Sequence, residues 1–307
     1  MHIGLIIYGT LDTVSGGYLY DRKLVAHLRA AGETVEVVSL PWTNYGRHLA
    51  HNWSRELWRR VENGRFDLLL QDELNHPSLF WLNRRLRGQV PLVSIVHHLR
   101  CSEARPAWQN WLYRQVERQY LASVDGFVFN SETTRRVTEG LVGKNRPFVV
   151  ATPAGDRFSP AITLAEAVAK AQEAAPLQLL FVGNLIPRKG LHTLLDALAT
   201  MPQSDGRLAV VGETAVSPTY TRHIQRQIAH HNLAANVTLH GPLPDAPLAD
   251  QFARSHLLVV PSSYEGFGMF TWKRWLLGCP PLAQRRIRRF TKSSTTAITA
   301  FLSPPMT

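Results

Sequence analysis

Two cationic side chains stand where a bound diphosphate would be expected in an α/β protein. Arg188 and Lys189 follow the apolar run 179–182 and precede a helix pattern of leucines, so this stretch predicts a strand, a cationic loop and a helix. In an open α/β sheet such a loop lies at the carboxyl end of its strand, where the free N–H groups of the next helix favour anions. A solvated basic turn explains this loop, taken alone, equally well.

Two histidines and a glutamate follow other apolar runs. His97 and His98 end one run, where histidine can contact a ligand, although a single histidine is most often structural. Glu265 lies in a Gly-rich turn beyond another run, and its carboxylate could bind sugar hydroxyls while Gly266 and Gly268 let backbone N–H groups face a substrate. A glutamate in a turn is by itself usually a solvated charge.

The elements that must position these residues alternate between strand and helix. Strands are predicted at residues 2–8, 34–40, 66–71, 90–97, 126–130 and 148–152, and in a second series at 177–182, 207–212, 235–240 and 256–261. Helices are predicted at about 18–31, from 132 onward, and at 163–175, 191–200, 219–232 and 246–253. This alternation predicts two domains, each with a parallel sheet covered on both faces, and a ligand in the cleft between them.

Gly16 and Gly17 follow the first predicted strand. They would let the backbone approach a ligand closely, or form a plain flexible turn. Gly32 is expected to end the first helix, and Ser131 to cap the helix that starts after it. The spacing of histidines, cysteines and carboxylates along the chain predicts no metal site.

The composition is that of an ordinary protein large enough for two domains. The chain has 307 residues, of which 45% are apolar and 19% charged. It contains no run of 18 uncharged apolar residues, and no cationic leader precedes its first apolar run, so neither a membrane-spanning helix nor a signal peptide is expected. Two isolated cysteines, Cys101 and Cys279, suggest a reducing compartment. The cytoplasm is therefore the expected location.

The net charge of +11 is concentrated at the end of the sequence. Residues 270–307 contain no Asp or Glu and seven basic residues, namely Lys273, Arg274, Arg285, Arg286, Arg288, Arg289 and Lys292, which leaves +4 for residues 1–269. The main part of the chain is only mildly basic. Nucleic-acid binding is therefore not predicted.

Three segments combine tryptophan with arginine, at residues 53–60, 81–87 and 108–118. Amphipathic helices of this kind can lie on anionic lipid, which would allow peripheral contact with the inner face of a membrane. They are also found as core-facing helices whose arginines are solvated. Both interpretations remain open at the level of sequence.

Taken in chain order, these motifs resemble the family 4 retaining glycosyltransferases, which have the GT-B fold of two facing Rossmann-like domains. The resemblance covers residues 1–269. It rests on Gly16-Gly17, His97-His98, Val128-Phe-Asn-Ser131, Phe181-Val-Gly-Asn-Leu-Ile-Pro-Arg-Lys-Gly190, Val210-Val-Gly212, Leu239-His-Gly-Pro242 and Pro261-Ser-Ser-Tyr-Glu-Gly-Phe-Gly268. It implies transfer of a hexose from a UDP- or GDP-linked donor to a sugar, lipid-linked or small-molecule acceptor, with retention at the anomeric carbon and no required metal or other cofactor.

The resemblance also assigns domains and roles. Residues 1–155 would bind the acceptor, and residues 156–269 would form a partial donor domain. Arg188 and Lys189 would hold the diphosphate and stabilise it as a leaving group. Glu265 would contact the donor hexose together with a histidine, for which His97 is preferred over His98. The remaining donor-binding positions would be Gly16, Gly17, Gly266, Phe267 and Gly268.

The sequence departs from the family pattern after Met269. The family spaces two glutamates as E-x7-E, but the position that corresponds to the second is Lys273. When each codon is taken one nucleotide earlier, residues 270–280 can become V-Y-L-E-A-M-A-F-G-L-P, in which the glutamate is forced because Trp272 has one codon. We therefore expect residues 270–307 to be an out-of-frame basic tail without helix or strand, which would leave the second domain incomplete. The alternatives are a divergent tail and, for function, an inactive remnant that retains at most ligand or membrane-surface binding.

Overall fold

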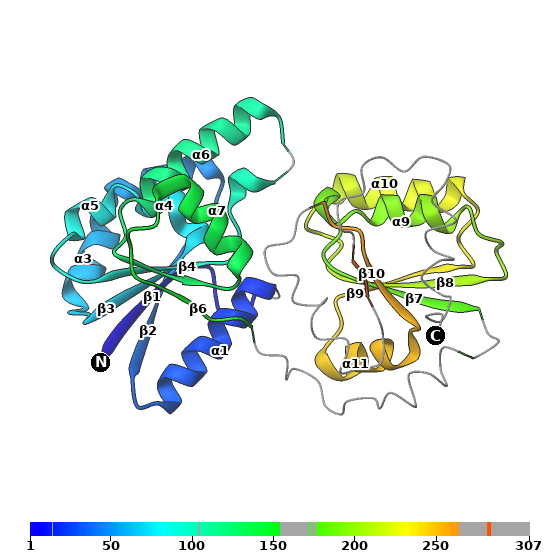
Figure 1. Ribbon diagram of the computed structural model, residues 1–307, viewed down its shortest axis with the longest axis horizontal. Coiled ribbons are helices and arrows are strands. Elements are labelled where there is room, and N and C mark those ends of the chain that lie inside the picture. The colour runs from blue at the N-terminus through cyan, green and yellow to red at the C-terminus, as the bar shows by residue number, and fades with distance from the viewer. Residues whose placement is uncertain (14, 104, 154–171, 173–175, 264–280, 284–307) are drawn as a thin grey trace, which may run out of the picture. The chain divides into compact units, whose positions relative to one another are not determined.

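The protein folds into two compact units, each built on a parallel sheet (Figure 1). The computed structural model describes residues 1–13, 15–103, 105–153, 172, 176–263 and 281–283. The first sheet lies within residues 1–153, and the second begins at residue 177. The helix predicted at 163–175 lies outside the described residues.

The first unit contains six strands in the order β2-β1-β3-β4-β5-β6. They are β1 (His2–Tyr8), β2 (Thr34–Leu40), β3 (Leu68–Asp72), β4 (Leu92–Val96), β5 (Gly126–Phe129) and β6 (Phe148–Val150). Helix α1 (Gly16–Ala30) covers one face of the sheet, and the helices that follow cover the other (Figure 1). These are α2 (Tyr45–Ala50), α3 (Arg55–Asn63), α4 (His76–Leu79), α5 (Leu82–Leu86), α6 (Ala107–Leu121) and α7 (Glu132–Val142). Because both faces are covered, β1 is buried along nearly its whole length.

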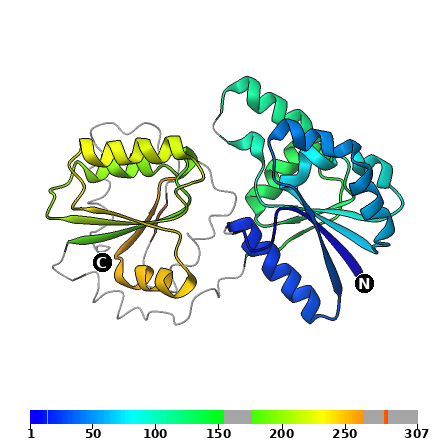
Figure 2. The same ribbon diagram turned by 180° about the vertical axis from the view of Figure 1, so that it is seen from behind.

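The second unit contains five strands in the order β11-β10-β7-β8-β9. They are β7 (Leu177–Val182), β8 (Gly206–Val211), β9 (Val237–Gly241), β10 (Leu257–Val260) and β11 (Pro281–Ala283). Helices α9 (Leu191–Leu198) and α10 (Pro218–His230) lie on one face and α11 (Asp245–Arg254) on the other, as Figure 2 shows from behind. The leucines that suggested a helix after the cationic loop are the buried face of α9. The predicted parallel α/β architecture is confirmed for both sheets.

Local sequence signals fix where several helices begin and end. The Ser15 hydroxyl accepts a hydrogen bond from the Tyr18 N–H (3.3 Å) at the start of α1, and Ser131 does the same for Thr134 (3.1 Å) at the start of α7. Gly32 follows the end of α1 with φ +88°, a conformation that L residues rarely adopt. The predicted Ser131 cap and the predicted glycine stop are confirmed, and the Ser15 cap is an addition of the structure.

The expectation of a tail without strand is wrong at one place. Residues 281–283 form β11, which pairs in parallel with β10 in the register Leu258↔Pro281 and Val260↔Ala283. Three residues are too few for the alternation that marks a strand in sequence, and the pairing depends on an already formed neighbour. The other residues after 269 lie outside the part that the structure describes.

Candidate functional site

His97 directly follows β4, and its side chain lies among residues from α1. Its Nε2 is hydrogen-bonded to Asp21 Oδ1 at 3.0 Å, and the ring of Tyr20 meets it edge-on with centroids 5.0 Å apart. A Cβ placed on Gly17 would lie 3.3 Å from His97 Cδ2, so the absence of a side chain lets α1 pack closely on the imidazole. The structure thus brings together His97 and Gly17, while Gly16 begins α1.

Burial and charge oppose each other in setting the protonation of His97. Burial acts to lower its pKa, but the charge and hydrogen bond of Asp21, together with the nearby Asp72 and Glu73, outweigh it and raise the pKa to about 9. At neutral pH His97 is therefore an imidazolium held by a buried carboxylate. Such a group can donate a hydrogen bond to an anionic or hydroxyl oxygen of a ligand.

Two further carboxyl groups lie behind His97 at the end of β3. Asp72 ends the strand and Glu73 follows it, and both are buried. Burial raises the pKa of Asp72 to about 7, with the Asp21 charge acting in the same direction. Burial, followed by the Asp72 charge, also raises the pKa of Glu73 well above its ordinary value.

A second polar group links these acids to α6. Glu117 accepts hydrogen bonds from the backbone N–H groups of Arg100 (2.5 Å) and Cys101 (3.1 Å). His76 Nδ1 lies 3.3 Å from Glu73 Oε1, and burial lowers the His76 pKa to about 4. His76 is thus neutral at pH 7, a structural histidine rather than a second cation in this site.

Two groups of side chains in the described part of the chain bring three potential metal ligands within 4.8 Å, namely Asp21, Asp72 and His97, and Glu73, His76 and Glu117. In each group a ring nitrogen is already engaged within the protein: His97 Nε2 with Asp21, and His76 Nδ1 with the Glu73 carbonyl at 3.1 Å. We assign neither group as a metal centre.

His98 has a different environment from its neighbour. Its Nε2 is hydrogen-bonded to Glu103 Oε1 at 3.0 Å, and the same carboxylate pairs with Arg105. Burial would raise the pKa of Glu103, but these two partners lower it to about 2. The His98 side chain therefore joins an ion-pair network on the segment before α6, whereas His97 faces α1.

The cationic stretch of the second unit lies at the carboxyl end of β7. Arg188 and Lys189 form a short 3₁₀ turn, Pro187–Lys189, where the sequence predicted a loop, and α9 starts just after it. Gly190 joins the two with φ +71°, and a Cβ there would lie 2.2 Å from the Pro261 carbonyl oxygen. Lys189 lies over Gly183, where an added Cβ would lie 3.3 Å from its Cδ. The turn is therefore built directly against the end of β10.

Pro261 is the link to the glutamate motif. It follows β10 immediately and leads, within four residues, to Glu265. Glu265, Gly266, Phe267 and Gly268 lie outside the described residues, so their predicted roles stay predictions. The structure places the cationic turn beside the strand end from which that motif departs.

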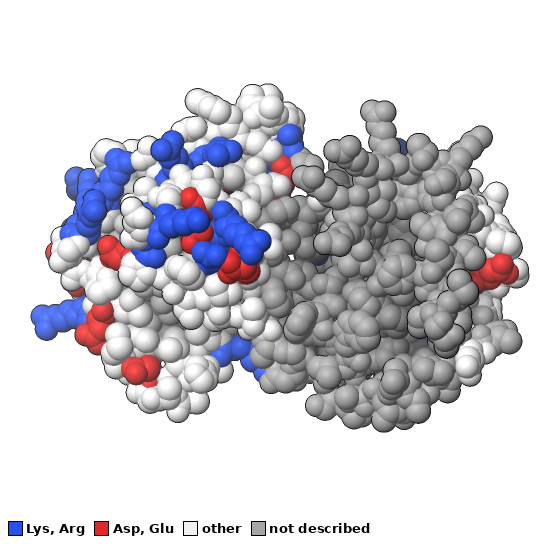
Figure 3. All heavy atoms as spheres, in the orientation of Figure 1, with Lys and Arg blue, Asp and Glu red and all other residues white. Residues whose placement is uncertain are grey.

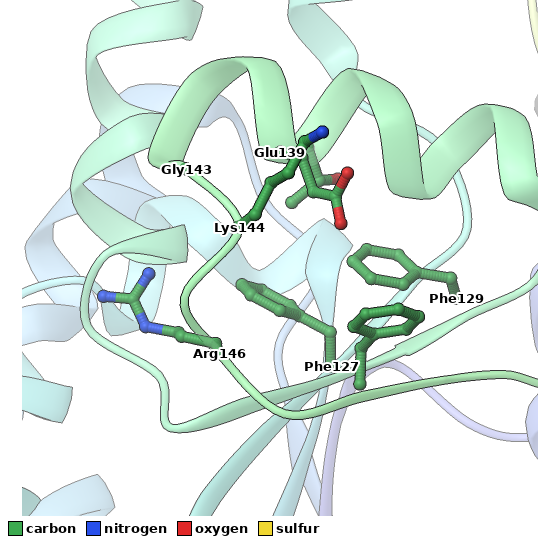
Figure 4. A pocket seen from close by; sticks show the side chains of 8 residues that line it. Phe127, Phe129, Glu139, Gly143, Lys144 and Arg146 are labelled. Atoms are coloured by element: carbon green, nitrogen blue, oxygen red, sulfur yellow. The ribbon is translucent and has the colours of Figure 1, made fainter.

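A small pocket elsewhere in the first unit is separate from these groups (Figure 4). It is lined by Phe127, Phe129, Thr138, Glu139, Gly143, Lys144, Arg146 and Phe148. The segment from Gly143 to Arg146 leads into the start of β6, so the pocket lies at the amino-terminal edge of the sheet. His97 follows β4 at the opposite edge, which is the edge where ligands of α/β sheets bind.

Two units that each contain a parallel α/β sheet, with His97 after one strand and the Arg188–Lys189 turn after another, agree with the GT-B fold of glycosyltransferases. A model of the glycosyl transferase 4-like domain matches residues 15–155, and a model of the glycosyl transferases group 1 matches residues 166–290. The chain belongs to the group 1 glycosyltransferases. The second match continues past Met269, and the frameshift there stays a hypothesis.

Individual relatives agree with this placement. The D-inositol 3-phosphate glycosyltransferase of Segniliparus rotundus is 29% identical over 224 residues, which are 68% of this chain and 50% of the relative. The enzyme of the same name from Rhodococcus opacus is 30% identical over 238 residues, 73% of this chain and 53% of the relative. The chain thus spans about half the length of the curated relatives it matches.

Solved structures show the same fold at lower identity. Sucrose-phosphate synthase from Thermosynechococcus elongatus has a TM-score of 0.72 and 21% identity, covering 91% of this chain and 80% of its own. HepE of Anabaena, solved in complex with UDP-glucose, has a TM-score of 0.64 and 19% identity. The match covers 92% of this chain and 79% of HepE. Both likenesses support the two-domain α/β fold.

Sequence reasoning missed the buried carboxyl groups around His97. Asp21 lies one helical turn beyond Gly17. Asp72 lies two residues after an apolar run and ends its strand, close to the kind of position that drew attention to His97. That position is the signal that could have found Asp72. Glu117 gave no signal, because it lies within a Trp- and Arg-rich helix pattern.

Proposed function

We propose that the protein transfers a hexose from a nucleotide-sugar donor to an acceptor with retention of configuration. The main support is the turn of Arg188 and Lys189 at the carboxyl end of β7. Gly190 holds this turn against Pro261. Two cations beside the first N–H groups of α9 suit a diphosphate. Family membership supports this proposal, as do related folds solved with UDP and with UDP-glucose.

In this proposal the chemistry is electrostatic stabilisation of a departing diphosphate. Arg188 and Lys189 supply fixed positive charge where negative charge develops, so that no metal ion is needed for this purpose. Glu265 contacts the donor hexose. His97 donates a hydrogen bond to a sugar or phosphate oxygen from the carboxyl end of β4.

Titration of the full chain with UDP-glucose and GDP-mannose by calorimetry tests donor binding. We expect saturable binding of at least one of these donors without added metal, and unchanged affinity in the presence of EDTA. Incubation with the bound donor and NMR of the released sugar then test turnover and anomeric configuration. Binding without turnover would favour the inactive remnant, and no binding of either donor would contradict the proposal.

We further propose that α6 provides a contact surface for an anionic membrane. Trp108, Trp111 and Leu112 are 64%, 60% and 47% exposed and follow the helical spacing of one face, so the core-facing alternative is wrong for them. Arg114 and Arg118 of α6 are exposed, while the acid of this helix, Glu117, is buried. Figure 3 shows basic side chains gathered over the elements around α6. An apolar stripe flanked by cations is the pattern of helices that lie in a lipid interface.

Replacement of Trp108, Trp111 and Leu112 together by serine tests this surface. Co-sedimentation with vesicles of phosphatidylcholine alone and mixed with phosphatidylglycerol should show wild-type binding to the anionic mixture. The triple variant should bind at least about tenfold less, because each large apolar side chain contributes about 1 kcal/mol or more when it leaves water. Trp53→Ser, which changes a tryptophan of equal exposure outside α6, is the control. Equal loss in both variants would contradict a specific role for α6.

No helix in the described part of the chain is long and apolar enough to cross a membrane. The contact proposed for α6 is therefore peripheral. It depends on the surface potential of anionic lipid and should weaken as salt is added.

A further inference from the structure

His97, Asp21 and Asp72 form a three-membered polar group contributed by three elements. Asp21 comes from α1, Asp72 from the end of β3 and His97 from the end of β4. One oxygen of each carboxyl group and one ring nitrogen lie within 4.8 Å of one another. Both aspartates are fully buried, whereas 11% of the His97 side chain is exposed. Only the histidine can therefore meet a ligand directly.

The hydrogen bonds of this group leave one oxygen of each carboxyl group without a partner among the described residues. Asp21 Oδ1 accepts from His97 Nε2, and Asp72 Oδ1 accepts from the Leu74 N–H at 2.9 Å. Asp21 Oδ2 and Asp72 Oδ2 have no hydrogen-bond partner among the described residues. Two adjacent buried carboxylates cannot both be ionised at low cost, since one imidazolium balances only one of them. A single proton shared by the two carboxyl groups would satisfy both.

We propose that Asp21 is the positioning residue of His97 and that Asp72 is a neutral carboxylic acid that donates its proton to Asp21 Oδ2. Asp21 then carries the one negative charge of the group and fixes His97 through Nε2. The other ring nitrogen, Nδ1, is the N–H that His97 can offer to a ligand. This last step rests on the proposed function, whereas the protonation of the group does not.

The surroundings of the group are consistent with this distribution of charge. The pKa of His97 is raised to about 9, so the imidazole is protonated at pH 7, and the pKa of Asp72 is raised to about 7, so this carboxyl group is mostly protonated at pH 6. The other titratable side chains that act on the group are Tyr8, Tyr18, Tyr20, Tyr120 and Glu73. Burial raises the pKa of all five, so the four tyrosines are neutral at pH 7 and the ionised form of Glu73 is disfavoured.

The imidazole is also held against rotation, as a positioning role requires. Gly17 packs on its ring at Cδ2 and Tyr20 meets it edge-on, while the Asn130 side chain donates to the His97 carbonyl at 2.9 Å. The hydrogen bond to Asp21 thus selects one ring orientation.

NMR titration of the His97 imidazole in the full chain, without ligand, tests the role of Asp21. In Asp21→Asn the pKa should fall from about 9 to below the ordinary value of about 6.5, because burial then acts with less opposition. Glu103→Gln is the matched control, since it removes the carboxylate partner of the adjacent His98 at the same 3.0 Å and should leave the His97 pKa unchanged. An unchanged pKa in Asp21→Asn would overturn the proposal.

The variant Asp72→Asn tests whether Asp72 acts as a protonated, neutral acid or as a negatively charged carboxylate. An amide replaces the protonated carboxyl group in shape and as a donor, so UDP-glucose affinity at pH 6 should change less than threefold. The His97 pKa should fall less than in Asp21→Asn, because Asp72 ionises above about pH 7 and then only adds to the charge of Asp21. Infrared difference spectra between this variant and wild type should show loss of a protonated carboxyl band at pH 6. Absence of that band, or a His97 pKa that falls as in Asp21→Asn, would overturn the assignment of Asp72.

The unfolding equilibrium provides a readout that needs no ligand and detects a failure to fold. A folded-state pKa raised from 3.8 to about 7 stabilises the fold below pH 3.8, and this contribution is lost as pH rises through about 7. The stability of Asp72→Asn relative to wild type should therefore increase with pH across that window and then level off. A constant difference would contradict a buried proton on Asp72. If neither UDP-glucose nor GDP-mannose binds while these results hold, the proposed function fails and this inference stands.

Discussion

Replacement of Arg188 and Lys189 together by alanine should weaken the binding of a nucleotide-sugar donor by about 100-fold or more. Each charge-assisted hydrogen bond to a phosphate contributes about 1.5–3 kcal/mol, and the double variant removes both cations of the turn. Transfer should fall further than binding, because the same charges stabilise the diphosphate as it departs. Calorimetry with UDP-glucose and a transfer assay measure the two effects separately.

Arg226→Ala is the control for the loss of positive charge. Arg226 lies on α10 of the same unit with its side chain exposed, so its removal changes the net charge without changing the turn. We expect its donor affinity to match wild type. If the double variant and the control bind UDP-glucose equally well, the turn is a solvated basic turn and the proposed function loses its main support.

Gly190→Ala should destabilise the second unit by about 3 kcal/mol or more. A non-glycine residue in the left-handed region costs about 1–2 kcal/mol, and the added Cβ would meet the Pro261 carbonyl oxygen at 2.2 Å, which backbone must move to relieve. Because that movement separates the cationic turn from the end of β10, donor binding should weaken as well. Urea unfolding of the full chain, followed with a probe in the second unit, measures the change.

Gly241→Ala isolates the contribution of the close contact. Gly241, the last residue of β9, has nearly the same φ, +69°, but nothing lies within 4 Å of its added Cβ. This variant should lose only about 1–2 kcal/mol, the conformational part of the cost. Equal losses at both positions would show that the contact with Pro261 does not fix the turn.

Much of the fold could be predicted because short contiguous segments of the sequence determine most strands and helices. The predicted bounds of β1, β2 and β7 agree with the structure, since each is an apolar run closed by a turn signal. The start of β3 was placed too early, because Phe66 is buried and apolar yet precedes the strand. In the sequence, a buried apolar residue outside a strand looks the same as an apolar residue within one.

The candidate site was predictable only in part, for a physical reason. The cationic turn is a contiguous segment, so its residues and its place after β7 could be predicted together. The acids around His97 come from α1, β3 and α6, separated by tens of residues, and each alone resembles a surface charge. Nothing in the sequence marks these acids as buried. Only strand pairing brings the segments together, and Asp21 and Asp72 are then fully buried.

Strand order in each sheet reverses direction once, between β1 and β3 in the first and between β7 and β10 in the second. The connections that leave such a pair of strands run to opposite faces of the sheet. A crevice therefore forms at the carboxyl ends of the two strands, whatever the side chains there. Asp72 ends β3 at the first reversal, and Gly190 meets Pro261 at the second. Topology therefore sets where ligands are received, and loop substitutions can alter which ligand is accepted while the strands that create the crevice stay the same.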